Sequence, residues 1–419
     1  MTPPLTNWAG NVIFRAARVH RPETVQQLQE IVRSSGRVRA LGTGHSFSPV
    51  ADTTGDLVSI GRLPVRFEVA PDRSVVTVSA GLRYGEVATR LHHAGLALHN
   101  LGSLPHISVA GAVATGTHGS GVALGALPTA VVSFELVTAT GALLRLDRSD
   151  PRFPGAVVAL GCLGVVAAVT LAVQPTYDVA QTVNLGLPMD AVRVGLDDIL
   201  AAGTSVSLFT TWGEDVIDQV WVKRRTDEPG AAPGADWLGS RAAAGPVHPV
   251  PGMSPVSCTE QLGVPGPWQQ RLPHFRLDHT PSSGTELQTE YLVPREHAVD
   301  ALDAVAAIRD EVAPVLQVSE LRSVASDDLW LSPAYEQDSL ALHFTWVDDT
   351  DAVRPVVTAL EERLHGLRAR PHWGKVFGTA PHVIRELYPR LADFAALRRE
   401  LDPENVFGNA MVDRYLSID

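Results

Sequence analysis

The chain has 419 residues, of which 45% are hydrophobic and 19% are charged. This balance is typical of a folded globular protein, and the length is sufficient for two domains. The formal net charge of −12 would repel phosphates over most of the surface, which argues against a nucleic-acid-binding protein.

The first 175 residues are predicted to alternate short helices and strands, many of them ending at glycine. Val25, Leu28, Ile31 and Val32 share the spacing of one helix face, and Ser34-Ser35-Gly36 stops that helix. The other predicted elements are strands at 37–41 and 74–80, a helix over Tyr84, Val87 and Leu91 that Gly95 closes, and a hairpin of 131–138 with 143–146.

The pattern of predicted secondary structure changes near Pro175. Residues 229–257 are rich in proline, glycine and alanine, carry no clear period, and predict an irregular surface segment. The elements predicted after it are strands at 285–293, 318–324 and 339–347, a helix over Val299, Leu302, Val305 and Ile308, and a helix from Val353 to about Leu367. Their order predicts an antiparallel sheet backed by helices, and hence an α+β fold.

Two stretches concentrate glycine beside hydroxyls and histidine: LGTGHSF at 41–47 and SLPHISVAGAVATGTHGSG at 103–121. Glycine lets the backbone approach a ligand closely, and successive free N–H groups can bind an anion such as pyrophosphate. Neither stretch is a Walker A loop or a G-x-G-x-x-G fingerprint. Each alone is equally compatible with ordinary glycine turns, and His45 or His118 alone with a structural role.

Taken together, these motifs resemble those of flavoproteins of the vanillyl-alcohol-oxidase type. The resemblance extends to four further stretches: NWAGN, VPGPWQQRLPHFR, ARPHWGKVF and LDPENVFGNAMV. Within that type, nearly the whole chain is similar to the alditol oxidase (xylitol oxidase) branch of the sugar-lactone oxidase group. The resemblance implies an FAD-binding domain (PCMH type) at 1–176 and an antiparallel-sheet substrate domain at 177–374. Residues 375–419 would form a C-terminal tail that returns to the FAD-binding domain.

The resemblance also implies which residues contact FAD. His45 matches the histidine that is joined covalently to the 8α carbon of the flavin. The other implied contacts are Ala40, Leu41, Gly42, Thr43, Gly44 and Ser46 around the pyrophosphate, Ser103, Ser108, Gly111, Thr115, Gly116, Thr117 and His118 in the second loop, and Gly164, Val165 and Val166 at the adenine end.

A candidate site in the second half begins with Glu320 and Arg322. Residues two apart on a strand share a face, so the carboxylate and the guanidinium point the same way. His343 and Thr345 share a face of the next strand in the same manner. From the residues alone, an ion pair that bridges strands is at least as good an interpretation, and Lys375 would be an ordinary surface lysine.

The resemblance assigns these residues to substrate binding, as a cluster of Ser103, Glu320, Arg322, Thr345 and Lys375 with His343 close by. Two cations beside the reacting hydroxyl, Arg322 and Lys375, would stabilise developing alkoxide character. A lysine beside an arginine also has a reason to lose its proton, which would suit it as the base. Glu320 and Thr345 would bind the outer hydroxyls and orient the substrate.

The activity implied is oxidation of a terminal hydroxyl of an open-chain polyol, such as xylitol or sorbitol, to the aldose. Hydride passes to FAD, and O2 takes the electrons to give H2O2. Gly102 stands where alanine is usual in the branch, and a small residue there keeps the oxygen path open. The alternatives are a sugar-1,4-lactone oxidase and a flavin- or sugar-binding protein without turnover.

The remaining expectations concern location and partners. No window approaches the roughly 20 apolar residues of a membrane helix, and the N-terminus lacks the features of a signal peptide. Cys162 and Cys258 could form one bridge but no disulfide framework. The 15 histidines show no zinc-ligand spacing. We expect a cytoplasmic monomer with reduced thiols and no metal, whose partners are a small polyol and O2.

Overall fold

The first half of the chain contains two main sheets and short helices. The computed structural model describes residues 4–230, 232–279 and 286–417. A parallel sheet has the order β1-β3-β2, and an antiparallel sheet has the order β4-β5-β9-β7-β8. The strands are β1 Arg18–His20, β2 Val38–Leu41, β3 Asp56–Ser59, β4 Phe67–Val69, β5 Val75–Ser79, β7 Val131–Val137, β8 Leu143–Asp147 and β9 Val165–Ala172.

The helices of this half are α1 Val25–Ser34, α2 Tyr84–His93, α3 Val109–Ala114 and α4 Phe153–Val157. Leu28 and Val32 of α1 are buried against the core of this half, which confirms the predicted helix face. The predicted hairpin is also confirmed, because β7 and β8 pair antiparallel. The short strands β6 Leu96–Ala97 and β10 Gln174–Pro175 pair with each other near the end of this half.

The second half is built on a nine-stranded sheet with the order β14-β11-β13-β12-β17-β18-β16-β19, and β15 pairs with β11. The strands are β11 Asp178–Pro188, β12 Ser205–Thr210, β13 Val216–Arg225, β14 Arg241–Ala242, β15 Gly266–Pro267, β16 Glu286–Pro294, β17 Leu316–Val324, β18 Ser339–Val347 and β19 Arg370–Pro371. The antiparallel sheet predicted for 285–347 is confirmed, although Thr285 lies outside the described residues.

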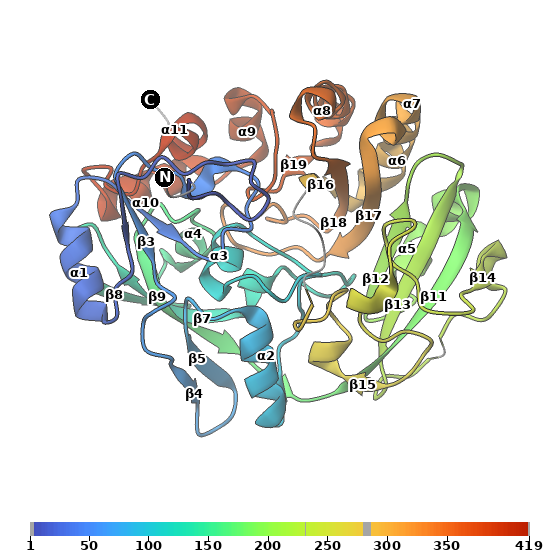
Figure 1. Cartoon of the computed structure of the whole chain (residues 1–419), viewed down its shortest axis with the longest axis horizontal. Helices are drawn as coiled ribbons and strands as arrows, with labels where there is room; N and C mark the ends of the chain where they lie inside the picture. The colour runs from blue at the N-terminus through green and yellow to red at the C-terminus, as the bar shows by residue number, and fades with distance from the viewer. Residues whose placement is uncertain (1–3, 231, 280–285, 418–419) are drawn as a thin grey trace.

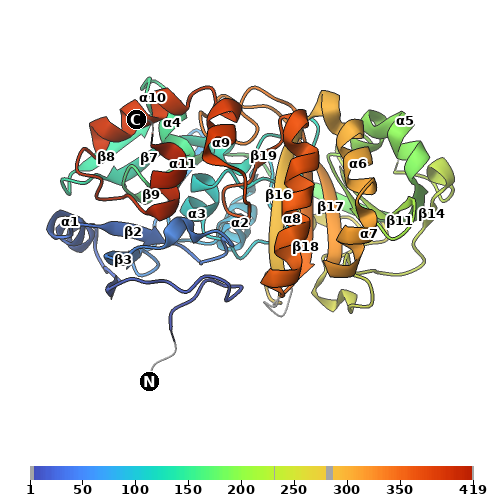
Figure 2. The same cartoon turned by 90° about the horizontal axis from the view of Figure 1, so that it is seen from above.

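Helices cover one face of the large sheet, as Figures 1 and 2 show. They are α5 Met189–Leu200, α6 Ala298–Ala306, α7 Arg309–Val312 and α8 Thr350–Leu364. Leu342, Phe344 and Trp346 of β18 pack into one apolar cluster with residues of α8. Because neighbouring residues of a strand point to opposite faces, His343 and Thr345 face away from these helices. This alternation places polar side chains on the face that meets the first half.

One boundary was predicted wrongly. Ile308 was expected on the same helix face as Val305, but α6 ends at Ala306. The backbone of Ile308 has φ −119° and ψ 21°, which breaks the helix before α7 begins. Its side chain is still buried in the same apolar cluster. The apolar spacing therefore predicted correctly that Ile308 is buried, but wrongly that the helix continues to this residue.

The C-terminal residues return to the first half of the chain. Helices α9 Pro381–Leu387, α10 Leu391–Leu401 and α11 Ala410–Leu416 lie beside it in Figure 1. The backbone N–H of Val38 donates to the carbonyl of Val406 at 2.8 Å. The side-chain amide of Asn409 donates to the carbonyl of Val50 at 3.0 Å. These contacts anchor the segment that follows β19 beside the loop after β2.

Candidate active site

The loop after β2 passes so close to α3 that glycine is required. A Cβ atom on Gly42 would lie 2.2 Å from Oγ of Ser108, the residue that precedes α3. Gly44 has φ +71°, a left-handed conformation that side chains disfavour. The sequence therefore folds this glycine loop tightly against the start of α3, where the backbone N–H of Ser108 donates to Oγ1 of Thr43 at 3.1 Å.

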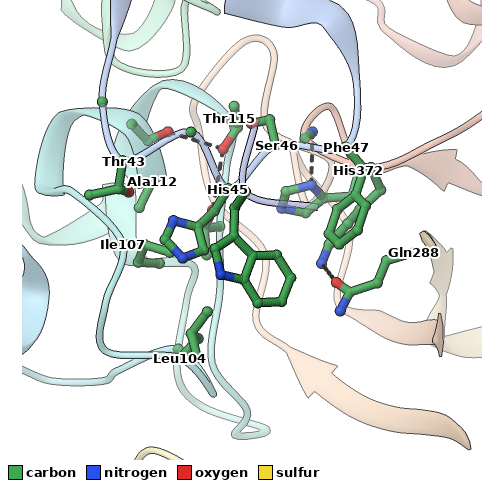
Figure 3. A pocket seen from close by; sticks show the side chains of 18 of the residues that line it. Thr43, His45, Ser46, Phe47, Leu104, Ile107, Ala112, Thr115, Gln288 and His372 are labelled. Atoms are coloured by element: carbon green, nitrogen blue, oxygen red, sulfur yellow. Dashed lines mark hydrogen bonds between the residues drawn. The ribbon is translucent and has the colours of Figure 1, made fainter. Parts of the chain in front are cut away.

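The loop borders a cavity of about 340 Å³ that extends between the two halves of the molecule. Nδ1 of His45 and Oγ of Ser108 are buried, and neither has a hydrogen-bond partner among the described residues. The His45 ring stacks on Trp8 with 5.4 Å between centroids, and Figure 3 shows it on the loop beside Ile107. The glycine cradle and the two unpartnered polar atoms fit a dinucleotide cofactor.

Burial lowers the pKa of His45 to about 4, with help from the charges of His106 and Lys375. Above that pH the imidazole is neutral, so a ring nitrogen keeps its lone pair. A neutral, oriented imidazole is the form that can act as a nucleophile. This property is what a covalent attachment at His45 would require.

Most of the predicted flavin contacts line this cavity. They are Ala40, Leu41, Gly42, Thr43, Gly44, His45, Ser46, Ser103, Ser108, Gly111, Thr115, Thr117, His118, Gly164 and Val166. Gly116 and Val165 are not among the lining residues, although each is adjacent to one that is. The side chain of Val165 is instead buried in the core of the first half.

The large sheet supplies the other wall of the cavity through two rows of side chains. Across β17, β18 and β16, Glu320 pairs with His343 and His343 pairs with Glu290. In the next row, Thr345 lies between Val318 and Gln288. The predicted substrate residues Ser103, Glu320, Arg322, His343, Thr345 and Lys375 all line this one cavity.

Arg322 is the centre of the charge network. Its Nη2 atom lies 2.5 Å from Oε1 of Glu290, its Nε lies 3.5 Å from Oε1 of Glu320, and its Nη1 donates to Oγ of Ser103 at 3.2 Å. Nε2 of His118 lies 3.1 Å from the same Glu290 oxygen. The cavity therefore contains a buried guanidinium held between two carboxylates.

These contacts keep the buried groups charged. Burial alone would raise the pKa of Glu320, but Arg322 and His274 more than offset it and hold the pKa below its usual range. Burial would lower the pKa of Arg322, but Glu320 and Glu290 raise it. Arg322 thus remains a cation, which suits it to stabilise negative charge that develops on a substrate oxygen.

Lys375 enters the cavity directly after Gly374. Its ammonium donates to Oε1 of Gln288 and lies 3.4 Å from Nε2 of His343. Burial lowers the pKa of Lys375, and the charge of Arg322 lowers it further, against the opposing effect of Glu290. Its amine can therefore lose a proton more readily than that of an exposed lysine.

Sequence reasoning missed Gln288 and Glu290, which hold the two cations of the site. Both lie on β16 and share a face, as Glu320 and Arg322 do on β17. The alternation of polar residues in ELQTEYL was therefore a usable signal. Gln288 accepts from Lys375 and contacts Nε2 of His343 at 3.1 Å; Figure 3 shows it on the side of the cavity opposite Ile107.

We expect Gln288→Leu to lower kcat/KM by about 10- to 100-fold, because a hydrogen bond to a charged group contributes about 1.5–3 kcal/mol. The matched control is Gln337→Leu. Gln337 donates to the carbonyl of Leu292 on the same strand but does not line the cavity. Steady-state kinetics on both variants separate the two effects. Equal losses in the two variants would reduce Gln288 to a structural residue.

Three observations concern metals, membranes and thiols. Within residues 4–230, 232–279 and 286–417, no group of histidine, cysteine, aspartate or glutamate is arranged to hold a metal ion. No helix in these residues is both long and apolar enough to span a membrane. Cys162 and Cys258 are buried and free.

Comparison with known proteins assigns the class. A sequence model of the FAD-binding domain matches residues 16–147, and one of D-arabinono-1,4-lactone oxidase matches residues 285–415. The fold is similar to that of cholesterol oxidase from B. sterolicum, with a TM-score of 0.79, 15% identity and coverage of 99% of this chain and 96% of that one. The fold and the cavity define an FAD-dependent oxidoreductase of the vanillyl-alcohol-oxidase type.

Several relatives cover nearly the whole chain. An alditol oxidase of a Streptomyces species is 52% identical over 415 residues, covering 98% of this chain and 99% of the relative. An L-gulono-1,4-lactone dehydrogenase of Mycobacterium tuberculosis is 29% identical and covers 99% of this chain and 100% of the relative. The chain belongs to the alditol oxidase family, as the sequence motifs predicted.

Proposed function

We propose that this protein oxidises a terminal hydroxyl of an open-chain polyol, such as xylitol or sorbitol, to the aldose. The observation that carries the proposal is the set of polar groups that line one cavity: Glu320, Arg322, Thr345 and Lys375, together with Ser103 from the second glycine-rich stretch. Such a set offers partners to several hydroxyls of one chain. Bound FAD supplies the hydride acceptor, and O2 accepts its electrons to give H2O2.

The proposed roles of the cavity residues in catalysis follow from their charges. Lys375, as the free amine, takes the proton of the reacting hydroxyl, while the guanidinium of Arg322 stabilises the negative charge left on oxygen. Glu320 and Thr345 bind the outer hydroxyls, and Ser103 is held by Arg322 at 3.2 Å. His343 lies in the row of Glu320 and Glu290 and contacts Gln288 of the next row, so it supports the position of Lys375.

We also propose His45 as the covalent attachment point of FAD, through the 8α carbon of the flavin. Its support is the buried Nδ1 without a described partner and a pKa lowered to about 4 by burial. The flavin-contacting set remains as predicted, including Gly116 and Val165 through their backbones. We further propose that the domains span residues 1–176, 177–374 and 375–419. The protein is proposed to be a cytoplasmic monomer.

A second candidate is oxidation of a sugar-1,4-lactone, which the match of residues 285–415 to the D-arabinono-1,4-lactone oxidase family supports. Identity favours the polyol, because the alditol oxidase relative is 52% identical and the lactone-active relative is 29% identical. A lactone fixes its hydroxyls in a ring and cannot extend them along the wall.

The substrate assignment predicts a steep dependence on hydroxyl number. A buried polar group left without its partner costs about 1–3 kcal/mol, so glycerol and 1-butanol should lose kcat/KM by about tenfold or more for each missing contact. Peroxide assays with xylitol, sorbitol, glycerol, 1-butanol and a 1,4-lactone measure this series. A lactone that exceeds every polyol by a wide margin would transfer the assignment to the second candidate.

A further inference from the structure

The composition of the basic residues singles out two positions. Of 34 lysine and arginine residues, only Lys223 and Lys375 are lysines. Both lie at the large sheet, and Lys375 belongs to the proposed active site. Lys223 is 1% exposed, which is rare for a lysine. A guanidinium stays protonated at any physiological pH, whereas an amine can lose its proton when buried. A lysine at these two positions can therefore change its protonation state, which an arginine cannot.

Lys223 is linked to the active site by a buried chain of hydrogen bonds. Its Nζ atom lies 2.9 Å from Nδ1 of His274 and donates to the carbonyls of Leu272, at 2.5 Å, and Pro273, at 3.1 Å. Nε2 of His274 lies 2.7 Å from Oε1 of Glu320. The chain thus runs from a lysine outside the substrate set to a carboxylate within it.

The charge of Lys223 fixes the tautomer of His274. An ammonium can only donate, so Nδ1 of His274 must accept and the ring proton sits on Nε2. Burial and the charge of Lys223 lower the pKa of His274 to about 4, so the ring is neutral. The N–H at Nε2 then donates to Oε1 of Glu320, which leaves the second oxygen of this cavity-lining carboxylate for a substrate hydroxyl.

The ring of His274 is also held in place mechanically. Phe209 and Trp221 pack against it edge to face, with centroids 5.5 Å and 5.3 Å away. The backbone N–H of His274 donates to the carbonyl of Ser103 at 3.0 Å. His274 therefore connects two proposed substrate residues, Ser103 from the flavin side and Glu320 from the sheet.

We propose that Lys223 and His274 form a positioning pair, in which the lysine ammonium fixes the histidine tautomer and the histidine orients Glu320 toward the outer hydroxyls of the substrate. Neither residue takes part in hydride or proton transfer. The pair acts on substrate binding and leaves the chemical step to Lys375 and Arg322. This inference rests on the polyol oxidation proposed above.

The pair should make substrate binding depend on pH. The titratable and charged groups that face Lys223 are His274 and Cys258 from the irregular segments and Glu320 and Arg322 from β17. Burial lowers the pKa of Lys223 to about 7. Above that pH the neutral amine has two hydrogens for three acceptors and a lone pair of its own, so it no longer forces Nδ1 of His274 to accept, and the tautomer that donates to Glu320 is no longer fixed. We expect KM for xylitol to rise as the pH increases through about 7.

The test compares variants of equal side-chain length. Lys223→Met and Lys223→Gln both remove the charge and the titration, but glutamine keeps an N–H donor. We expect Lys223→Met to raise KM for xylitol by about tenfold or more while kcat stays within about threefold. Lys223→Gln should raise it less, and neither variant should show the rise in KM above pH 7. His274→Gln, which retains a donor near Nε2, should lose less affinity than His274→Met.

Flavin absorbance and melting temperature report whether each variant folds. Wild-type KM values and an unchanged pH profile in both Lys223 variants would overturn the pair. Should the variants not accumulate, the nitrogen-15 NMR signals of histidine in the wild type decide instead: protonation of His274 at Nε2 supports the pair, and protonation at Nδ1 below pH 7 overturns it. A wild-type enzyme that oxidises no polyol refutes the proposed function, whereas an active wild type with unaffected variants refutes only the pair.

Discussion

Replacing Lys375 or Arg322 with methionine is expected to lower kcat/KM for xylitol by about 10²–10³, since loss of one donor that stabilises developing charge has effects of this size. Methionine keeps most of the side-chain volume but removes the charge. Loss of Arg322 leaves two buried carboxylates, Glu290 and Glu320, without their shared cation. Loss of Lys375 removes the cation that donates to Oε1 of Gln288. The flavin loops are on other elements, so the visible spectrum should change little.

The control is Arg193→Met, because Arg193 pairs with Asp303 on the surface, with its Nε 2.9 Å from the carboxylate, and does not line the cavity. It should retain nearly full activity, as surface ion pairs contribute about 0–1 kcal/mol. The double variant of Lys375 and Arg322 should lose less than the product of the two single losses, because both act on one oxygen atom. Near-normal turnover in both single variants would remove these residues from the mechanism.

Replacing His45 with alanine is expected to abolish covalent attachment of FAD completely. In the wild type the flavin should stay with the denatured polypeptide, and ultraviolet fluorescence of the denatured band measures this. The variant can still bind FAD without the bond, since the glycine cradle of Gly42 and Gly44 is part of the backbone. A matched control is His106→Ala, because Nε2 of His106 donates to the carbonyl of Leu277 and His106 does not line the cavity.

Release of free flavin from the denatured wild type would disprove the covalent linkage, while leaving FAD binding and the fold assignment intact. A fluorescent band in the His45→Ala variant would place the linkage on another residue.

The sequence predicted those parts of the fold where one face of an element is apolar and the other polar. Strand β18 shows this best, because Leu342 and Phe344 pack on helices while His343 and Thr345 face the cavity. The positions of Glu320 and Arg322 followed from the same alternation. Their function did not, since a pair of charges on a strand is equally consistent with a structural ion pair.

Strands β11, β12 and β13, between residues 178 and 225, were not predicted, for a physical reason. On β11, Gln181 and Asn184 are almost fully buried, and on β13 Lys223 is buried as well. From the sequence alone, polar residues at such positions are expected to be exposed to solvent, because polar groups are rarely buried without hydrogen-bond partners. Their partners come from distant segments: the amide of Gln181 donates to the carbonyl of Glu260 at 3.1 Å. No local pattern contains that information.

The central claim is that a polyol is oxidised at this cavity wall, and anaerobic mixing of the purified wild-type protein with xylitol tests it most directly. Without oxygen, electrons taken from the substrate remain on the flavin, so its yellow absorbance should bleach at a rate that saturates with xylitol. The Lys375→Met variant should bleach about 10²–10³ times more slowly. No bleaching by xylitol or sorbitol, together with rapid bleaching by a 1,4-lactone, would contradict the account.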